Sequence, residues 1–224
     1  MTSLLGPASR LLDLALPPVC AGCGREGHAI CPRCLPSLGT RVDLPPGTPL
    51  GLADGPPDPL LQLEWCSPFA GSTRRALHAL KYAGERRLAT PLGAVVAERW
   101  GRAGAGGQLL VPVPVHAGRR RERGYDQAAL IAEAAARHLG MPWREAVVRT
   151  RATAAQYRLD RNHRASNVAD AFAVDPSARS SIDGRWVVLV DDVVTTGATL
   201  CATARALLDG GAGAVSAIAV ARER

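Results

Sequence analysis

The stretch VVLVDDVVTTGAT, residues 187–199, decides the fold of this chain. Its first four residues are apolar and predict a buried strand, which we expect to cover 185–190. Two adjacent carboxylates follow, Asp191 and Asp192, and then a small, hydroxyl-rich turn leads into a predicted helix at 198–208. An apolar strand joined to a helix in this way is typical of α/β proteins with a parallel sheet.

The end of this strand is also the first candidate site, because ligands of open parallel sheets bind beyond the carboxyl ends of the strands. A helix amino end presents unpaired N–H groups and a partial positive charge, so it suits a phosphate. Gly197 lets the backbone approach that anion closely, and Thr195, Thr196 and Thr199 add hydroxyl donors. The two carboxylates suit a different part of the ligand, namely the two neighbouring hydroxyls of a ribose.

The rest of the chain extends the same α/β pattern on both sides of this stretch. Further strands are predicted at 65–71, 108–115, 145–149 and 214–221, and further helices at 72–85, with Ser72 as cap, 90–100 and 127–139. Gly140 is expected to close the last of these helices. Residues 116–127 read as a basic loop, and 149–167 as a polar, arginine-rich segment. We therefore expect a parallel sheet with helices on both faces.

Composition limits the classes of function. The chain has 224 residues, of which 47% are apolar, so one sizeable core is possible. The net charge of +7 comes from 26 arginines and one lysine against 20 acidic residues, and it permits binding to phosphates. Aromatic residues make up only 4% of the chain, which leaves few rings for stacking single-stranded nucleic acid.

Four cysteines near the start form a second candidate site. Cys20, Cys23, Cys31 and Cys34 make two C-x2-C pairs within CAGCGREGHAICPRC. This spacing lets four sulfurs reach one tetrahedral zinc ion, and we predict a structural zinc site. Two disulfides or a redox pair are the alternatives, and we expect reduced thiols because no secretion signal is apparent. His28 could compete as a ligand, whereas isolated Cys66 and Cys201 are expected to be buried.

The predicted organisation has three parts: an N-terminal helix and zinc-binding unit at 1–40, a Pro/Gly-rich linker at 41–64, and an α/β domain at 65–224. Apolar residues at helical spacing occur within 2–18, but this run is too short to cross a bilayer. We therefore expect a cytoplasmic protein without membrane insertion.

Several motifs together resemble a known family. The stretch at 187–199 resembles the phosphoribosyl diphosphate motif of type I phosphoribosyltransferases. The whole chain is similar to the ComF family, competence-associated phosphoribosyltransferase-like proteins with an N-terminal zinc knuckle. The motifs that carry this resemblance are the cysteine pairs, LKYAGE, VPVP, RERGYDQA, TAAQYRLDRNHRASNV and the acidic stretch, in that order.

The resemblance implies roles for individual residues. Asp191 and Asp192 would hold the ribose hydroxyls and, with Arg123, serve catalysis, while the turn would bind the 5′-phosphate through Thr195, Thr196, Gly197, Ala198 and Thr199. A diphosphate loop would include Val115, His116, Arg119, Arg120 and Arg123. A mobile loop would include Arg149, Gln156, Arg161 and Arg164. Mg²⁺ would bridge the diphosphate and the ribose.

Some roles stay open at this point. Enzymes of the class that act on 6-oxopurines have an aspartate where this chain has Thr195, so hypoxanthine and guanine are less expected. Lys81 could reach the diphosphate or lie in solvent, and Tyr125 and Tyr157 could stack on a base, line a partner surface or simply pack.

Three functions remain compatible with these residues. The first is an enzyme that transfers phosphoribose to an unknown acceptor. The second is a module that binds the sugar diphosphate or single-stranded DNA and helps DNA uptake, with a protein of the competence machinery as a possible partner. The third is a zinc-anchored adaptor for a motor or recombination partner, in which the ligand pocket is a relic. The intact acidic pair and threonine turn favour a working ligand site over a relic.

Overall fold

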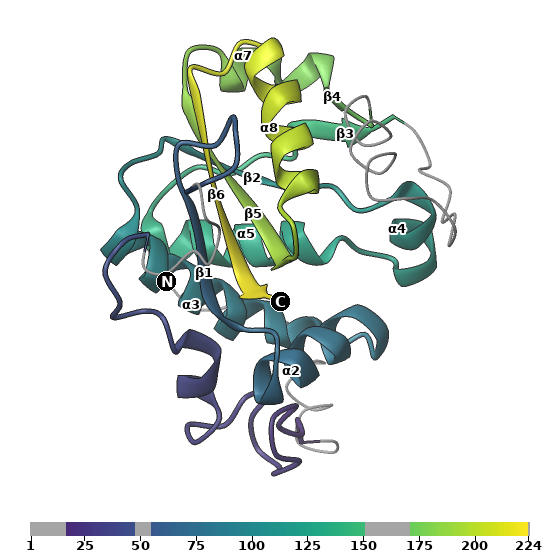
Figure 1. The fold of residues 1–224 in the computed structure, drawn as a ribbon. Helices are drawn as coiled ribbons and strands as arrows, with labels where there is room; N and C mark the ends of the chain where they lie inside the picture. Colours follow the sequence, from purple (N-terminus) through teal and green to yellow (C-terminus); the bar gives the residue numbers. More distant parts are fainter. Residues whose placement is uncertain (1–16, 48–54, 151–170, 224) are drawn as a thin grey trace.

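The computed structural model describes residues 17–47, 55–150 and 171–223. Its centre is a four-stranded parallel sheet with the order β1-β6-β5-β2. The strands are β1 (Leu63–Pro68), β2 (Leu109–Pro112), β5 (Trp186–Val194) and β6 (Ala214–Arg222). The small antiparallel pair β3 (Val147–Arg149) and β4 (Phe172–Val174) lies beside this sheet (Figure 1).

Helices connect the strands and cover both faces of the sheet, as the sequence predicts. The α-helices are α2 (Gly71–Tyr82), α3 (Ala89–Ala103), α4 (Ala117–Arg123), α5 (Gln127–Leu139), α7 (Arg179–Ile182) and α8 (Ala198–Asp209). Short 3-10 turns are η1 (Leu35–Gly39), η2 (Arg86–Leu88) and η3 (Pro176–Ala178).

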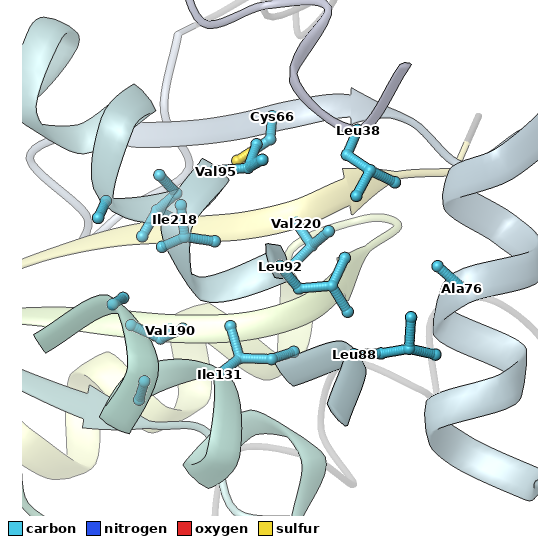
Figure 2. Packing of buried hydrophobic residues seen from close by; sticks show 14 of the residues in the cluster. Leu38, Cys66, Ala76, Leu88, Leu92, Val95, Ile131, Val190, Ile218 and Val220 are labelled. Atoms are coloured by element: carbon cyan, nitrogen blue, oxygen red, sulfur yellow. The ribbon is translucent and has the colours of Figure 1, made fainter. Parts of the chain in front are cut away.

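Alternate side chains of β5 enter two separate cores. Val188 and Val190 pack with residues of α2, α3 and α5, and Figure 2 shows Val190 near Ile131 in this cluster. Val187 and Leu189 face the opposite side, where α7, α8, β3 and β4 cover the sheet. Because a strand directs successive side chains to opposite faces, a strand buried on both sides is apolar throughout.

Two predicted features were wrong in detail. Residues 116–127 were expected to form a loop, but 117–123 form helix α4. The Nδ1 atom of His116 accepts a hydrogen bond from the Gly118 amide at the start of α4, and Gly124 ends the helix with a left-handed φ of 74°. Ser72 does not cap α2, because the helix begins at Gly71 with Ala70 before it.

Strand β5 is longer than predicted and includes the acidic pair. Its parallel pairing with β6 continues past Asp191 to Val194, which lies opposite Arg222. Both aspartates therefore belong to the paired part of β5 rather than to the following turn. This placement fixes their backbone and directs their side chains to opposite faces.

The proline-rich region contains ordered, tightly held backbone. The fully buried Arg99 on α3 pairs with Glu64 on β1, with 2.5 Å between Nη2 and Oε2. The Arg99 Nη1 atom also donates to the carbonyls of Arg41, at 2.7 Å, and Leu44, at 2.5 Å. A buried guanidinium needs such acceptors, so Arg99 ties residues 41–45 to the edge of the sheet. The predicted domain boundaries remain a prediction.

None of the helices in the described residues is both long and apolar enough to pass through a bilayer. The predicted N-terminal helix within 2–18 begins outside the described residues.

Candidate functional site

The acidic pair lies near the carboxyl end of β5 and is held in two different environments. Asp192 is buried, with 5% of its surface exposed, whereas Asp191 is partly exposed. The Asp192 amide donates to Oδ1 of Asp191 at 2.8 Å. Although part of the residue is exposed, desolvation of its carboxylate raises the pKa of Asp191 well above its usual value, and the neighbouring charge of Asp192 raises that pKa further. The electrostatic coupling of the two carboxylates favours binding of a ligand or cation that supplies donors or positive charge.

Lys81 supplies positive charge to this pair in the free protein. Its Nζ atom lies 2.6 Å from Oδ2 of Asp192, and both side chains are mostly covered, with 18% and 8% of their surface exposed. Of the two alternatives that the sequence left open for Lys81, solvent exposure is wrong. Lys81 stands 111 positions before its partner, so sequence spacing gives no signal of this contact.

A small cavity lies at the turn between β5 and helix α8. Residues 193–200 and Asp191 line this cavity of about 50 Å³. Gly197 precedes α8 with a φ of 82°, a left-handed conformation that suits glycine. The ideal Cβ position of Gly197 also lies 3.3 Å from Cγ of Pro57, so the proline-rich segment packs against this turn. The first amides of α8 have no partner within the helix and point toward the turn.

The threonine hydroxyls are available to a ligand in this turn. Thr195 and Thr196 are exposed, as is Ala198, and Thr199 is half-buried. The Oγ1 atom of Thr196 lies 3.4 Å from the Ala198 amide. The five residues that the resemblance assigns to the 5′-phosphate thus form one continuous turn beside the acidic pair.

Helix α4 carries the arginines of the predicted diphosphate loop. Arg120 pairs with Glu145 at 2.6 Å, and this bond raises the pKa of Arg120. Arg119 is exposed on the same short helix. Because Arg120 already has a carboxylate partner, Arg119 and Arg123 are the members of this set that are more readily available to an anion.

Arg123 is connected to the acidic pair through Gln127. The Nη1 atom of Arg123 donates to Oε1 of Gln127 at 3.0 Å, and Nε2 of Gln127 donates to Oδ2 of Asp192 at 3.2 Å. The guanidinium of Arg123 also lies 5.1 Å from the ring centroid of Tyr82. Gln127 therefore links the basic helix to the end of β5, a role that sequence reasoning missed.

Asp126 fixes the connection between β2 and α5. Its carboxylate accepts from the amides of Val115, Ala128 and Ala129, at 3.0, 2.9 and 3.2 Å. It thereby caps α5 and holds Val115 and the adjoining His116 near the start of that helix. Burial raises the pKa of Asp126, while these three amides lower it. Sequence reasoning missed this residue, although an aspartate before an apolar helix is the usual signal of a cap.

Two segments of the motif series, LKYAGE and RERGYDQA, pack directly on each other. Tyr125 of RERGYDQA donates its hydroxyl to the carbonyl of Leu80 in LKYAGE. The Arg86 guanidinium lies 4.6 Å from the Tyr125 ring centroid. Tyr125 is 8% exposed, so the packing alternative is the correct one for this residue.

The predicted mobile loop falls mainly outside the described residues. Gln156, Arg161, Arg164 and Tyr157 all lie within 151–170. Arg149 is described at the end of β3, where its guanidinium lies 5.4 Å from the ring centroid of Phe172.

The four N-terminal cysteines come together as the spacing predicts. Their sulfur atoms all lie within 4.8 Å of one another, and the Sγ atoms of Cys23 and Cys31 are 3.6 Å apart. A tetrahedron with zinc–sulfur bonds of about 2.3 Å has edges of about 3.8 Å, so the cluster fits a zinc ion. Burial by itself raises the pKa of Cys20, but amides of Cys31, Cys23 and Gly22 lower it to about 6.

The remaining thiols behave as expected from their surroundings. Burial and the neighbouring thiols raise the pKa of Cys34 to about 12. Cys66 and Cys201 are buried, as predicted, and both are free thiols. His28 is not among the residues of the described metal-ligand cluster.

Comparison with known proteins now places the chain. DNA utilization protein YhgH of Escherichia coli (strain K12) is 34% identical over 204 residues, which span 88% of this chain and 86% of that protein. This chain belongs to the ComF family. Competence protein ComFC of Bacillus subtilis (strain 168) is 32% identical over 115 residues, which span 51% of this chain and 44% of that protein.

Two further comparisons match shorter parts of the chain. Competence protein F of Haemophilus influenzae is 37% identical over 94 residues, covering 42% of this chain and 41% of that protein. The family described as phosphoribosyl transferase domain matches residues 126–224. That match includes Asp126, Gln127, the acidic pair and the threonine turn. The ComF chain therefore has a phosphoribosyltransferase-type α/β fold with an N-terminal four-cysteine cluster that could hold zinc.

Proposed function

We propose that this ComF protein binds phosphoribosyl diphosphate with Mg²⁺ and transfers its phosphoribosyl group to an acceptor. The observation that carries this proposal is the acidic pair at the end of β5, followed by a turn whose cavity opens beside the amino end of α8. The turn suits the 5′-phosphate, and the adjoining carboxylates suit the ribose hydroxyls. Membership of the family and the match to a phosphoribosyl transferase domain support the same ligand.

The basic residues near this site suit the diphosphate. Arg119 and Arg123 belong to α4, which follows β2 at the same edge of the sheet. The link through Gln127 keeps Arg123 close to Asp192. An arginine clamp stabilises a leaving group on which negative charge increases, and such preorganised charge is a large part of catalysis.

The residues present fit a magnesium ion that is held mainly by the substrate. Among the described residues, only the four cysteines form a group of three or more candidate metal ligands. Mg²⁺ usually binds through one or two carboxylates together with substrate phosphates and water, and the partly exposed Asp191 would supply one carboxylate. When bound, the ion would neutralise charge on the departing diphosphate.

The transfer itself needs few protein atoms. The lone pair of the acceptor attacks the anomeric carbon of the ribose, the bond from that carbon to the diphosphate oxygen breaks, and its electron pair leaves with diphosphate. Asp192 and Asp191 orient the ribose through its hydroxyls, and α8 fixes its phosphate end. Holding both ends of the sugar positions the anomeric carbon for attack.

The four-cysteine cluster is proposed to hold one structural zinc ion. All four ligands are sulfur, which leaves no open position and is typical of structural sites. The surrounding segment has little apolar core of its own, so metal binding would contribute directly to its folding.

Substitution at Asp192 tests the ligand assignment. Asp192→Asn removes the charge at the ribose hydroxyls and should weaken binding of phosphoribosyl diphosphate with Mg²⁺ about ten-fold or more, because hydrogen bonds to charged groups contribute roughly 1.5–3 kcal/mol. Isothermal calorimetry measures that affinity, and release of diphosphate with a pool of acceptors measures turnover. Glu133→Gln, on the exposed face of α5, is the matched control. Equal affinity of Asp192→Asn and the wild type would reject the assignment.

A second candidate function is a binding module without turnover that acts in DNA uptake. The names of the relatives favour it, since they are a DNA utilization protein and two competence proteins. In that case single-stranded DNA or a competence-machinery protein would be a partner. Binding of a fluorescent oligonucleotide that resists competition by phosphoribosyl diphosphate would favour this function over the enzyme.

A further inference from the structure

A larger cavity lies beside the four-cysteine cluster, away from the acidic pair. Its volume is about 490 Å³, and it is lined by Cys23, Gly24, Arg25, Arg33 and Cys34. Small-molecule sites usually have volumes of about 300–1,000 Å³. This cavity therefore has room for a small organic molecule, and the zinc ion proposed for the cysteines makes no use of that room.

The cavity opens on one half of the cysteine cluster and leaves the other half covered. Cys23 is exposed and Cys34 is partly exposed, whereas Cys20 and Cys31 each have only 2% of their surface accessible. All four sulfur atoms lie within 4.8 Å of one another. A reagent in the cavity thus meets Cys23 first, with the covered thiols directly behind it.

Two arginines give the cavity a positive charge. Arg25 and Arg33 are both exposed, and within the described residues neither guanidinium forms an ion pair. Glu26 follows Arg25 in the chain but does not line the cavity. Arginine binds carboxylates through paired hydrogen bonds, and its charge raises the local concentration of anions. The cavity therefore favours a small molecule that carries carboxylates.

The exposed sulfur of Cys23 has a neighbour that can complete an oxidation. Its Sγ atom lies 3.6 Å from Sγ of Cys31. A thiolate attacks a disulfide to give a mixed disulfide, which a second thiolate within reach can then resolve. Redox-sensitive cysteines are typically accessible and next to such a resolving cysteine. Cys23 meets both conditions, whereas Cys66 and Cys201 are buried and lie outside the cluster.

We propose that this cavity binds an anionic low-molecular-weight disulfide, such as glutathione disulfide, which oxidises Cys23 and Cys31 to a disulfide and thereby releases the zinc ion. This inference rests on the proposed zinc site and is independent of the proposed phosphoribosyl diphosphate site. Arg25 and Arg33 hold carboxylates of the reagent, so that its S–S bond lies against Cys23. The N-terminal unit is then a redox-sensitive element as well as a structural one.

The reaction balances without a further oxidant. The thiolate of Cys23 attacks one sulfur of glutathione disulfide, the S–S bond of the reagent breaks, and its electron pair leaves on the first glutathione thiolate. The thiolate of Cys31 then attacks the sulfur of Cys23, the mixed disulfide breaks, and the second glutathione thiolate leaves. Two protein thiolates are oxidised and one glutathione disulfide is reduced. The two thiolates that remain cannot complete the tetrahedral shell of a structural zinc site.

Zinc release under oxidation tests this proposal on the full-length protein. Protein purified without chelator is mixed with glutathione disulfide at low ionic strength, and a chromogenic chelator records the free zinc. We expect release of about one zinc ion per chain. Tandem mass spectrometry after alkylation should find Cys23 modified first and then joined to Cys31, with Cys66 and Cys201 still reduced.

A cationic disulfide separates the role of the arginines from general thiol reactivity. Cystamine has the same reactive bond but carries amines in place of carboxylates. At low ionic strength, the double variant Arg25→Gln and Arg33→Gln should release zinc about three-fold to ten-fold more slowly with glutathione disulfide, and no more slowly with cystamine. High salt should remove the difference, because it screens the charges.

The matched control makes the same change in net charge elsewhere. It combines Arg137→Gln on α5 with Arg179→Gln on α7, and Figure 1 shows α7 at the end of the molecule opposite the cysteine unit. This control should react at the rate of the wild type with both disulfides. Circular dichroism verifies that each variant is folded.

The outcomes separate this inference from the zinc assignment. Elemental analysis of untreated protein reports zinc alone, so a protein without zinc counts against the zinc site, while the order of thiol modification still tests the inference. Modification that begins at a cysteine other than Cys23, or equal rates for the wild type and the arginine double variant with glutathione disulfide, overturns the inference. Loss of zinc from the folded double variant without any oxidant also overturns it, because the arginines then stabilise the cluster rather than attract the reagent.

Discussion

Replacing Lys81 with methionine should destabilise the protein through the carboxylate that it leaves behind. Lys81→Met keeps most of the side-chain volume but removes the cation 2.6 Å from Asp192. At that separation and an effective dielectric constant of about 20, the direct attraction is about 6 kcal/mol before the cost of removing both charges from water. Removing one partner leaves the other charge covered and unpaired. This loss typically lowers the free energy of unfolding by about 3–5 kcal/mol.

The structure places the expected loss at the lower end of this range, about 3 kcal/mol. Lys81 keeps 18% of its side-chain surface exposed, so water already compensates part of the interaction. Gln127 continues to donate to Oδ2 of Asp192 and offsets a further part.

The loss should also depend on pH. Burial, and then the charge of Asp192, raise the pKa of Asp191, while Lys81 lowers it. A carboxyl whose folded-state pKa is raised binds its proton more tightly in the folded protein, so its contribution to stability declines as pH rises through that pKa. Without Lys81 this pKa rises further, so the destabilisation should be larger at a pH above the wild-type pKa of Asp191 than at a pH below it.

Urea unfolding followed by tryptophan fluorescence, without Mg²⁺ or ligand, measures these differences. Lys81→Arg retains a cation and should lose less stability than Lys81→Met. Adding Asp192→Asn to Lys81→Met should restore much of the loss, because the unpaired charge is then gone. If the free energy of unfolding of Lys81→Met lies within about 0.5 kcal/mol of the wild type both below and above that pKa, the pair of Lys81 and Asp192 does not stabilise the fold.

Three further predictions concern other parts of the fold. Cys31→Ser should lower zinc content measured by elemental analysis of protein purified without chelator, and a wild type without zinc would reject the metal site. Gly93→Ala places a methyl group 2.4 Å from Cβ of Ala134 and should cost about 1–3 kcal/mol in urea unfolding, since α3 and α5 must separate. Gly197→Ala would put a side chain on a residue with a φ of 82° and close to Pro57, which should distort the turn. Calorimetry should then show weaker binding of phosphoribosyl diphosphate, and unchanged affinity would show that the turn does not bind the phosphate.

The elements with strong local signals could be predicted from the sequence. Helix α5 begins at Gln127 and ends at Leu139, the bounds that its apolar pattern predicts, because Asp126 caps it and Gly140 closes it with a φ of 66°. The strand, turn and helix at 187–199 are equally local. Each depends on residues that lie within a few positions of one another.

The contacts that complete the site could not be predicted in this way. Lys81 meets Asp192 only because α2 and β5 pack in the fold, and Arg99 meets Glu64 only because α3 crosses β1. Helix α4 is a different case, since a seven-residue helix is too short to be stable alone. Its sequence predicts a basic loop, because the contact between Arg120 and Glu145 forms only in the folded protein.

Helix α2 connects the four-cysteine unit to the acidic pair. At its amino end, Nη2 of Arg75 donates to the carbonyl of Gly22 at 2.5 Å, between two of the cysteines. At its carboxyl end, Lys81 pairs with Asp192 and Tyr82 contacts Arg123. A helix of 12 residues is a stiff rod about 18 Å long, so fixing one end restricts the other. The cysteine unit therefore holds the outer end of the element that brings Lys81 and Tyr82 to the acidic pair.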